Sequence, residues 1–583
     1  GRVLKHSDVI FHPQTGQPQV SLQFDGEGKR LFEELTKRNV GKRIAIFLDG
    51  VPITAPVVEE AITGGEAVIT GTFTIQESKQ LATRLNAGAL PVPISLASRT
   101  TVGPSLGKES LAKSIAAGAL GLLLLTIIML VLYRLPGLIA LLALAIYGLL
   151  LAAILQVLGA TLTLAGVAGI ILSFGMAVDA NILIFESVKQ ELRRGALLAR
   201  ALTEGFREAW PSIRDSNSSS LITAALLYFF GSSVVKGFAT TLAIGIVVSI
   251  FSGIVVTRML LRVVVLFRAA QSSRLYVPPA AASRAAGEGF PLLGRSRLWL
   301  GLSSVLVLGS IAAIAGWGLR PGIDFTGGSF LELRGEGVSV RSVRTALERA
   351  GAGAGTVQEH GAEGILVRLP PLSTEEHADL LKKLRTENAA IEEARFETVG
   401  PTIGRELLRK ALLAVALAVV LILGYHAIAF PRATGTVSPW AFGAIAVIAV
   451  VHDLLIMAGV FAVLARYGGA SADSLFLTAA LTLLGFSVHD TIVVFNRVKS
   501  NLARLRLQFA DLVHRSVLET LTRSLNTSAS TLFVLLALLV FGGSTIQAFV
   551  LTLSVGIVVG AYSSIFVASP LLIFWQQRRS AGR

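Results

Sequence analysis

Two aspartates stand in long apolar segments of the sequence, and one arginine is placed to pair with them. Asp179 lies in GMAVDANILIFE and Asp490 in GFSVHDTIVVFN, segments made mostly of apolar and small residues. An ionised carboxylate in lipid costs several kcal/mol unless it is paired or hydrated, so both side chains should face the interior of a helix bundle. Arg523 begins an apolar segment after a basic loop, where it could meet Asp490. A carboxylate that exchanges its proton against an arginine partner is the unit of a proton relay, and we predict that role for these three residues.

Other polar side chains in apolar segments have competing interpretations. Asp215 is either a relay group or the cap of a helix entered at Ser216, and Asp453, beside His452, is either a relay group or a structural carboxylate. His489 could titrate near neutral pH or form a hydrogen-bonded packing contact. These three are secondary relay candidates. Four further side chains are predicted to form hydrogen bonds between helices: Asn181, Asn217, Asn526 and Ser528.

Several other chemistries lack the residues that they need. The chain has no Cys, which removes thiolate metal sites and cysteine nucleophiles. It contains no Walker A or HExxH sequence, so bound ATP and that type of zinc site are not supported. The one GxSxG match, GPSLG at 103–107, stands just before a predicted membrane helix, so a serine nucleophile elbow is not supported either. We therefore predict no catalytic residue, no metal and no cofactor, with protons as the coupling ion.

The composition indicates a membrane protein. The 583 residues are 53% hydrophobic and 15% charged, with a mean hydropathy of +0.68, which is too little charge to cover several soluble cores. The net charge of +15 could indicate a nucleic-acid partner, but the excess lies in short loops beside apolar segments. The positive-inside rule explains that pattern, so no nucleic acid is expected and the C-terminus is predicted to be cytoplasmic.

Eleven segments reach the roughly 20 residues that a helix needs to cross a bilayer. They are 112–133, 137–158, 161–185, 217–232, 237–258, 298–318, 409–430, 438–464, 473–495, 524–543 and 547–575. One further helix before Gly1 would give twelve. The basic stretches Glu186–Arg207 and Arg497–Arg515 are predicted to be interfacial helices in contact with anionic membrane lipids.

The spans divide the chain into six regions. Strand-like and helical patterns before the first span predict an α+β domain outside the cytoplasm, and a second polar insertion predicts another. In order, the regions are a first α+β domain, 1–110, truncated at its N-terminus; membrane helices, 111–260; a cytoplasmic basic linker, 261–297; one helix, 298–318; a second α+β domain, 319–408; and membrane helices with a cytoplasmic tail, 409–583.

The chain contains an internal duplication. Val102–Gly107 (VGPSLG) recurs as Val399–Gly404 (VGPTIG), and the segment with Asp179 recurs as the segment with Asp490. RDSNS at 214–218 corresponds to RSLNT at 523–527, and the segment from Phe230 corresponds to that from Phe541; the four offsets are 297, 310, 309 and 311 residues. One unit of a polar domain and about five helices is therefore present twice in the same orientation. Transporter sites commonly lie where such halves meet.

These segments also carry a resemblance to a known family. LDGVPITAPVVEEAITGGEAVITGTFT, LNAGALPVPI and GMAVDANILIFE resemble SecD, whereas GIDFTGGS, VGPTIGREL, VHDTIVVFNRV and RSLNTS resemble SecF. The chain as a whole is similar to the bacterial SecDF family, in which SecD and SecF are fused. The resemblance implies a duplicated helix bundle of the resistance-nodulation-division (RND) superfamily with two ferredoxin-like α+β domains.

The same resemblance implies a function and a location. Family members reside in the bacterial cytoplasmic (inner) membrane and use the proton gradient to assist preprotein export through the SecYEG channel. It implies the unfolded preprotein as substrate, and it adds a YajC-like accessory and an insertase as further candidate partners. Proton passage between the halves would be coupled to movement of the domains outside the membrane, with hinges in the two VGP segments: Gly103, Pro104, Gly107, Gly400, Pro401 and Gly404.

Two alternatives share some of these features. An RND-type exporter of small molecules or lipids would have the same duplicated core, but its domains outside the membrane are usually much larger than the roughly 110 and 85 residues here. An intramembrane aspartyl protease would also use two membrane carboxylates, yet no Gly-x-Gly-Asp sequence surrounds either aspartate. The export motor is therefore the preferred hypothesis.

Overall fold

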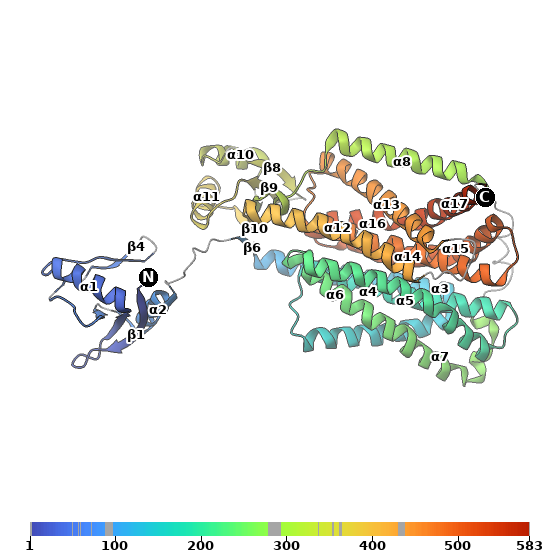
Figure 1. The fold of residues 1–583 in the computed structure, drawn as a ribbon, viewed down its shortest axis with the longest axis horizontal. Coiled ribbons are helices and arrows are strands. Elements are labelled where there is room, and N and C mark those ends of the chain that lie inside the picture. Colours follow the sequence, from blue (N-terminus) through green and yellow to red (C-terminus); the bar gives the residue numbers. More distant parts are fainter. Residues whose placement is uncertain are drawn as a thin grey trace. The chain divides into compact units, whose positions relative to one another are not determined.

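The computed structural model describes residues 3–581 except 49–50, 56, 59, 71–72, 88–96, 278–292, 336, 353–354, 361–363 and 430–437. The chain forms two compact units, Gly1–Leu96 and Ala97–Arg583, whose elements are drawn in Figure 1. In that view α3 to α7 of the first repeat run from light blue to green, α8 is yellow-green, and α12 to α17 of the second repeat run from orange to red.

The first unit is a small α+β domain. Its sheet has the antiparallel order β1-β2-β5, and β3 and β4 form a separate hairpin. Val20, Leu22 and Ile69 of the sheet pack with Leu81 of α2 in a small core. The elements are β1 Leu4–Phe11, β2 Pro18–Phe24, α1 Gly26–Arg38, β3 Ile46–Leu48, β4 Val51–Thr54, β5 Glu66–Ile69 and α2 Ile75–Ala87.

The second α/β domain has the ferredoxin-like βαββαβ order that the resemblance implied for both domains, whereas the described elements of the first unit follow the order ββαβββα. Its five-stranded sheet has the order β6-β10-β7-β9-β8, and the apolar faces of α10 and α11 pack on the sheet through Leu347, Leu384 and Phe396. The elements are α9 Ile323–Thr326, β7 Gly328–Arg334, α10 Val340–Arg349, β8 Thr356–His360, β9 Gly364–Leu369, α11 Thr374–Glu387 and β10 Glu392–Val399.

The edge strand β6, Ser98–Val102, comes from the first repeat and pairs antiparallel with β10 (Figure 1). Thr100 lies opposite Glu397, its equivalent at the 297-residue offset of the repeat. At one end the Gly103 N–H donates to the Ala394 carbonyl (2.8 Å), and at the other the Gly400 N–H donates to the Ala97 carbonyl (3.0 Å). Because these contacts exchange equivalent residues, a local two-fold axis passes between the strands. We call this pairing the strand clasp.

The clasp changes the predicted domain boundary. The first compact unit ends at Leu96 rather than at residue 110, because β6 belongs to the sheet of the other domain. Pro104 and Pro401, the predicted hinge prolines, begin the helices that follow the two clasp strands, α3 and α12. Proline fits there because the first turn of a helix has no use for its missing N–H.

The helices of the first repeat follow the clasp. α3 contains two predicted spans, which are separated by a break at Arg134 (φ 51°, ψ −116°) just before Pro136. The helices are α3 Pro104–Val157, α4 Leu164–Arg193, α5 Leu198–Phe230, α6 Ser233–Phe251 and, after a π turn at Ser252–Val256, α7 Thr257–Val265.

The helices of the second repeat match this arrangement. A π turn at Ser564–Ala568 stands at the position equivalent to the π turn of the first repeat, so the duplication preserves even this irregularity. The helices are α8 Ser296–Trp317, α12 Pro401–Ala429, α13 Pro439–Tyr467, α14 Ser474–Arg504, α15 Phe509–Phe541, α16 Ser544–Ser563 and α17 Ser569–Ala581.

The protein is a polytopic helical membrane protein, as predicted. Within the described residues nine helices are long and apolar enough to cross a membrane. This number is lower than the number of predicted spans because α3, which contains two of them, counts once despite its break, and because α5 is not included, since its first half is polar. The basic stretches predicted as separate interfacial helices instead extend the bundle helices α4, α5, α14 and α15. Ion pairs and hydrogen bonds between these extensions, such as Arg504–Glu208 at 2.7 Å, explain the difference.

Candidate proton-relay site

The two helices that carry the aspartates are the most enclosed of the bundle. In both α4 and α14, 83% of the most apolar window is buried within the protein, against 11–56% for the other candidate spans. Small residues permit this close packing: Gly175 of α4 lies against Thr531 of α15, and Gly485 of α14 lies against Thr223 of α5. Asp179 and Asp490 are thereby held away from lipid, as the cost of a membrane charge requires.

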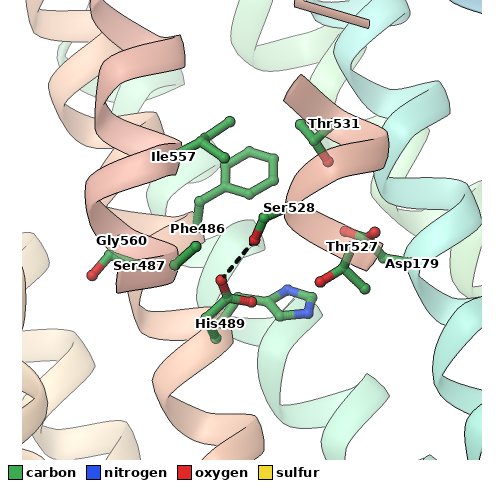
Figure 2. Close-up of a pocket in the computed structure, with 11 residues that line it drawn as sticks. Asp179, Phe486, Ser487, His489, Thr527, Ser528, Thr531, Ile557 and Gly560 are labelled. Carbon is green, nitrogen blue, oxygen red and sulfur yellow. Dashed lines mark hydrogen bonds between the residues drawn. The ribbon is translucent and has the colours of Figure 1, made fainter. Parts of the chain in front are cut away.

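Both carboxylates line one small cavity of about 10 Å³, close to the space that a single water needs. Figure 2 shows Asp179 across this cavity from Ser487 and His489, with Thr527 and Ser528 of α15 between them. Equivalent segments of the two repeats thus meet where the halves of the bundle meet, with Asp179 aligned to His489 and Asp490 one residue further on. Duplication of the sequence is the physical reason, because parallel repeats related by an axis along the membrane normal bring equivalent helices face to face.

α15 supplies a hydroxyl to each carboxylate. The Ser528 hydroxyl donates to Asp490 (3.3 Å), and the Ser530 hydroxyl donates to Asp179 (3.4 Å). Ser530 is not among the residues predicted from the sequence, although it lies only two residues after Ser528 in the same polar stretch. Spacing along α15 could have indicated it, because Arg523, Thr527 and Ser530 follow the i, i+4, i+7 pattern of one helix face.

Arg523 lies on the same face of α15, one turn before Thr527. The charges of Asp490 and Asp179 both act on its guanidinium, as does that of Glu186. Among the described residues, however, Arg523 has no carboxylate within 4.0 Å, and its Nε has no hydrogen-bond partner. The arginine is therefore near all three carboxylates and bound to none of them.

Arg523 also lines a second cavity of about 410 Å³, at the end of the bundle away from the second α/β domain. We call this cavity the vestibule. Its walls carry the carboxylates Glu186, Glu208 and Glu519, together with Arg497 and Arg504. Asp179 and Asp490 thus line the small cavity, and Arg523 lines the large, charged one.

The secondary candidates fall in different places. Asp453 is fully buried, 2.8 Å from His452 Nδ1, and accepts hydrogen bonds from Ser487 (2.6 Å) and Ser563 (2.8 Å). Since Ser487 lines the cavity of Asp490, this carboxylate lies next to the site. His489 lines the cavity itself.

Asp215 is neither in the cavity nor at a helix end. It lies well inside α5, so its interpretation as a helix cap is wrong; the helix begins at Leu198 because the polar stretch before residue 216 is helical too. Its carboxylate pairs with Arg214 (2.8 Å) and accepts a hydrogen bond from the Tyr425 hydroxyl (2.9 Å).

Three of the four polar side chains predicted at helix interfaces make contacts between helices. Asn526 donates to the Tyr133 hydroxyl of α3 (2.8 Å), and Asn181 accepts from the Thr257 hydroxyl of α7 (2.8 Å). Ser528 binds Asp490 as described above. Asn217 differs, because its side-chain amide donates to the Ile213 carbonyl of its own helix (2.8 Å).

The predicted hinge glycines have unequal surroundings. A Cβ at Gly404 would lie 2.7 Å from the Gly327 nitrogen, so this position is needed for close packing. A Cβ at Gly103 or Gly400 would lie 3.2 or 3.3 Å from a carbonyl oxygen of the strand clasp, whereas Gly107 faces open space. A hinge role for these residues stays a prediction.

Comparison with known proteins identifies the relatives of this chain. The family model "Protein export membrane protein SecD/SecF, C-terminal" matches residues 86–266 and 379–578, and the "SecDF, P1 head subdomain" matches residues 1–92. The protein translocase subunit SecDF of Thermus thermophilus is 41% identical over 592 residues, covering 100% of this chain and 77% of that protein. The protein translocase subunit SecD of Thermobaculum terrenum is 50% identical over 268 residues, covering 45% of this chain and 52% of that protein.

A solved structure agrees with these matches. The crystal structure of SecDF from Thermus thermophilus, described as a translocon-associated membrane protein, superposes with a TM-score of 0.79 at 39% identity and covers 99% of this chain and 78% of that one. The predicted resemblance is confirmed, and the chain, a transport factor, belongs to the SecD/SecF family of protein export membrane proteins.

Proposed function

We propose that this protein is a motor driven by the proton-motive force that assists preprotein export through the SecYEG channel. Membership of the export family supports the role in export. One observation carries the proton step: Asp179 and Asp490, from equivalent segments of the two repeats and one residue apart in the alignment, line one small cavity with Arg523 nearby on α15. Such a constellation is expensive in a membrane, and membrane carboxylates with an arginine partner are a common arrangement for proton transfer.

The chemistry of the step follows from charge balance. When both carboxylates are ionised, the single positive charge of Arg523 is shared between them. A proton that reaches either carboxylate neutralises it and weakens its attraction for Arg523, which favours a change in the packing of α15 against α4 and α14. Release of the proton towards the vestibule restores the original charges.

Coupling to the soluble part would pass through α14, which carries Asp490. The N-terminal end of α14 is bound to the second α/β domain: Asp324 Oδ2 accepts from the Ser474 N–H (2.8 Å), and the Ala472 carbonyl accepts from the Gly322 N–H (2.7 Å). Arg368 of β9 adds a hydrogen bond to the Ser471 hydroxyl (3.2 Å). A shift of α14 would therefore be transmitted to this domain, and the emerging preprotein would be bound and released outside the membrane.

The basic ends of the helices support an orientation for the chain. We place the vestibule and the C-terminus in the cytoplasm, and both α/β domains outside it, in the bacterial inner membrane. The partners in this proposal are SecYEG, the unfolded preprotein and membrane lipids, with a YajC-like accessory and an insertase as further partners.

Membrane vesicles with an imposed proton gradient test the proposal. Release of a preprotein should depend on the gradient with the intact protein, and Asp179→Asn or Asp490→Asn should abolish that dependence. Asp215→Asn is the matched control, since Asp215 is a buried aspartate that does not line the cavity. Unchanged gradient-dependent release in both cavity variants, at matched protein levels in the membrane, would refute the relay.

A further inference from the structure

Glu186 is a buried carboxylate on the same face of α4 as Asp179. The two residues are seven positions apart, which is two helical turns and about 10 Å along the axis. Glu186 is 7% exposed and lines the vestibule, whereas Asp179 lines the small cavity of about 10 Å³. One helix face therefore carries two carboxylates, each in contact with a different cavity.

Arg523 interacts with both of them. Its guanidinium experiences the charges of Asp490, Asp179 and Glu186, and it lines the vestibule together with Glu186. No carboxylate of the described residues lies within 4.0 Å of it, so the arginine forms no ion pair with any of them in this structure. A buried guanidinium stays charged, so it needs an anion nearby in every state of the cycle.

The other carboxylates of the vestibule already have cationic partners outside the relay. Glu208 pairs with Arg504 (2.7 Å), and Glu519 pairs with Arg497 (2.5 Å) and Arg515 (3.1 Å). Within the described ranges, the cation paired with Glu186 is Lys189 of its own helix, at 3.0 Å. The charge of Glu186 is among the largest that act on Arg523.

Resting on the function proposed above, we propose that Glu186 is the counter-ion that receives Arg523 while Asp179 and Asp490 hold protons. In the deprotonated state Arg523 is attracted to the two aspartates. Once they are neutral, the charge of Glu186 attracts the guanidinium, which moves towards the vestibule, while Glu519, one turn before Arg523 on α15, stays paired with Arg497 and Arg515. Glu186 is thus a positioning residue, which acts on the protons through the arginine.

The groups around Glu186 allow it to attract Arg523 and also to release it again. Lys189 compensates part of the charge of Glu186, and its Nζ lies 5.9 Å from the centre of the Tyr133 ring. The Tyr133 hydroxyl interacts with Glu186 and accepts a hydrogen bond from Asn526, which is three residues after Arg523 on α15. His489 of α14 is a further titratable group that interacts with Arg523. Glu186 therefore attracts Arg523 without trapping it.

Proton flux into proteoliposomes, measured with an internal pH dye under an imposed gradient, tests this role. We expect Glu186→Gln to lower the proton flux about tenfold. We also expect the pH at which the flux is half-maximal to fall by about one unit. Both are the size of effect that one nearby charge has in a partly screened protein interior. The direction follows because Arg523 then stays with the aspartates, which load protons only at greater acidity. Glu186→Asp keeps the charge and should restore most of the flux.

Glu208→Gln is the matched control, because it removes a vestibule carboxylate whose partners are Arg504 and Arg194. We expect wild-type flux and an unchanged pH profile for it. Glu186→Gln with wild-type flux and pH profile, or an equal effect of Glu208→Gln, would overturn the counter-ion role. If the wild type itself shows no more flux than Asp490→Asn, the relay fails, which is a distinct result from failure of Glu186 alone.

Discussion

Asp473, the residue just before α14, provides a stability test of the junction between the bundle and the second α/β domain. Its carboxylate caps α14 by accepting from the Leu475 and Phe476 N–H groups at 2.9 and 3.0 Å. Burial, together with the nearby charge of Asp324, raises the pKa of Asp473 from 3.8 to about 6. Keeping this group ionised at neutral pH therefore destabilises the folded protein.

The sign of the effect follows from proton binding. Between about pH 4 and pH 6 the folded state holds a proton at Asp473 that the unfolded state has lost, so the stability from this group is complete below pH 4 and is lost as pH rises through 6. A pKa rise of two units corresponds to at most about 3 kcal/mol, and the partial solvent access of this side chain reduces it to about 1–2 kcal/mol.

Asp473→Asn should recover that loss, because asparagine caps a helix as well as aspartate and carries no charge. Thermal unfolding of the purified protein in detergent should show a higher midpoint for the variant at pH 8 and almost none of the gain at pH 4.5. Asp511→Asn, at an exposed carboxylate in the first turn of α15, controls for general charge effects. A lower midpoint at pH 8 would refute the reasoning, since it would mean that the ionised cap stabilises α14 more than burial penalises it.

Two further predictions concern packing and the strand clasp. Thr100→Cys combined with Glu397→Cys should form a disulfide on mild oxidation, because the two residues are opposite each other in a non-hydrogen-bonded pair. The chain has no other Cys, so the disulfide should appear as a mobility shift after cleavage in the linker. Two free thiols after oxidation would contradict the pairing. Gly205→Ala should lower the free energy of unfolding by about 1–3 kcal/mol in a thermal melt, because its Cβ would lie 2.8 Å from the Val188 nitrogen. Gly107→Ala, with open space around it, should leave the stability unchanged. Equal unfolding midpoints for the two variants would show that α4 and α5 can separate freely.

Local pattern and repetition predict much of the fold. Apolar length locates the spans, and the duplication alone places Asp179 and Asp490 in equivalent segments. The clasp strand β6 is not indicated by the sequence, because its partner β10 is almost 300 residues away and a short exposed strand has no apolar alternation to mark it. Pairing across such a distance depends on tertiary structure, which a local pattern does not contain.

Side-chain partners are harder to predict than helices. Charged residues mark a membrane boundary, so a polar stretch such as 198–216 resembles a loop, yet it continues α5 as helix beyond that boundary. The roles of Glu186 and Ser530 depend on how α4 crosses α15, which sets the neighbours of each side chain; the spacing of Ser530 from Arg523 marks a shared helix face but not the partner that this face meets. Asp215 is similar, since its partners Arg214 and Tyr425 explain its burial only in three dimensions.

The strand clasp also bears on how the two halves could be made as separate chains. Its hydrogen bonds join backbone groups of equivalent residues, and these residues lie outside the basic linker that connects the halves. The relative from Thermobaculum terrenum, a SecD subunit, matches only 45% of this chain. A separately synthesised first half could dock by adding its edge strand to the sheet of the other subunit, with the local two-fold axis fixing the register of assembly.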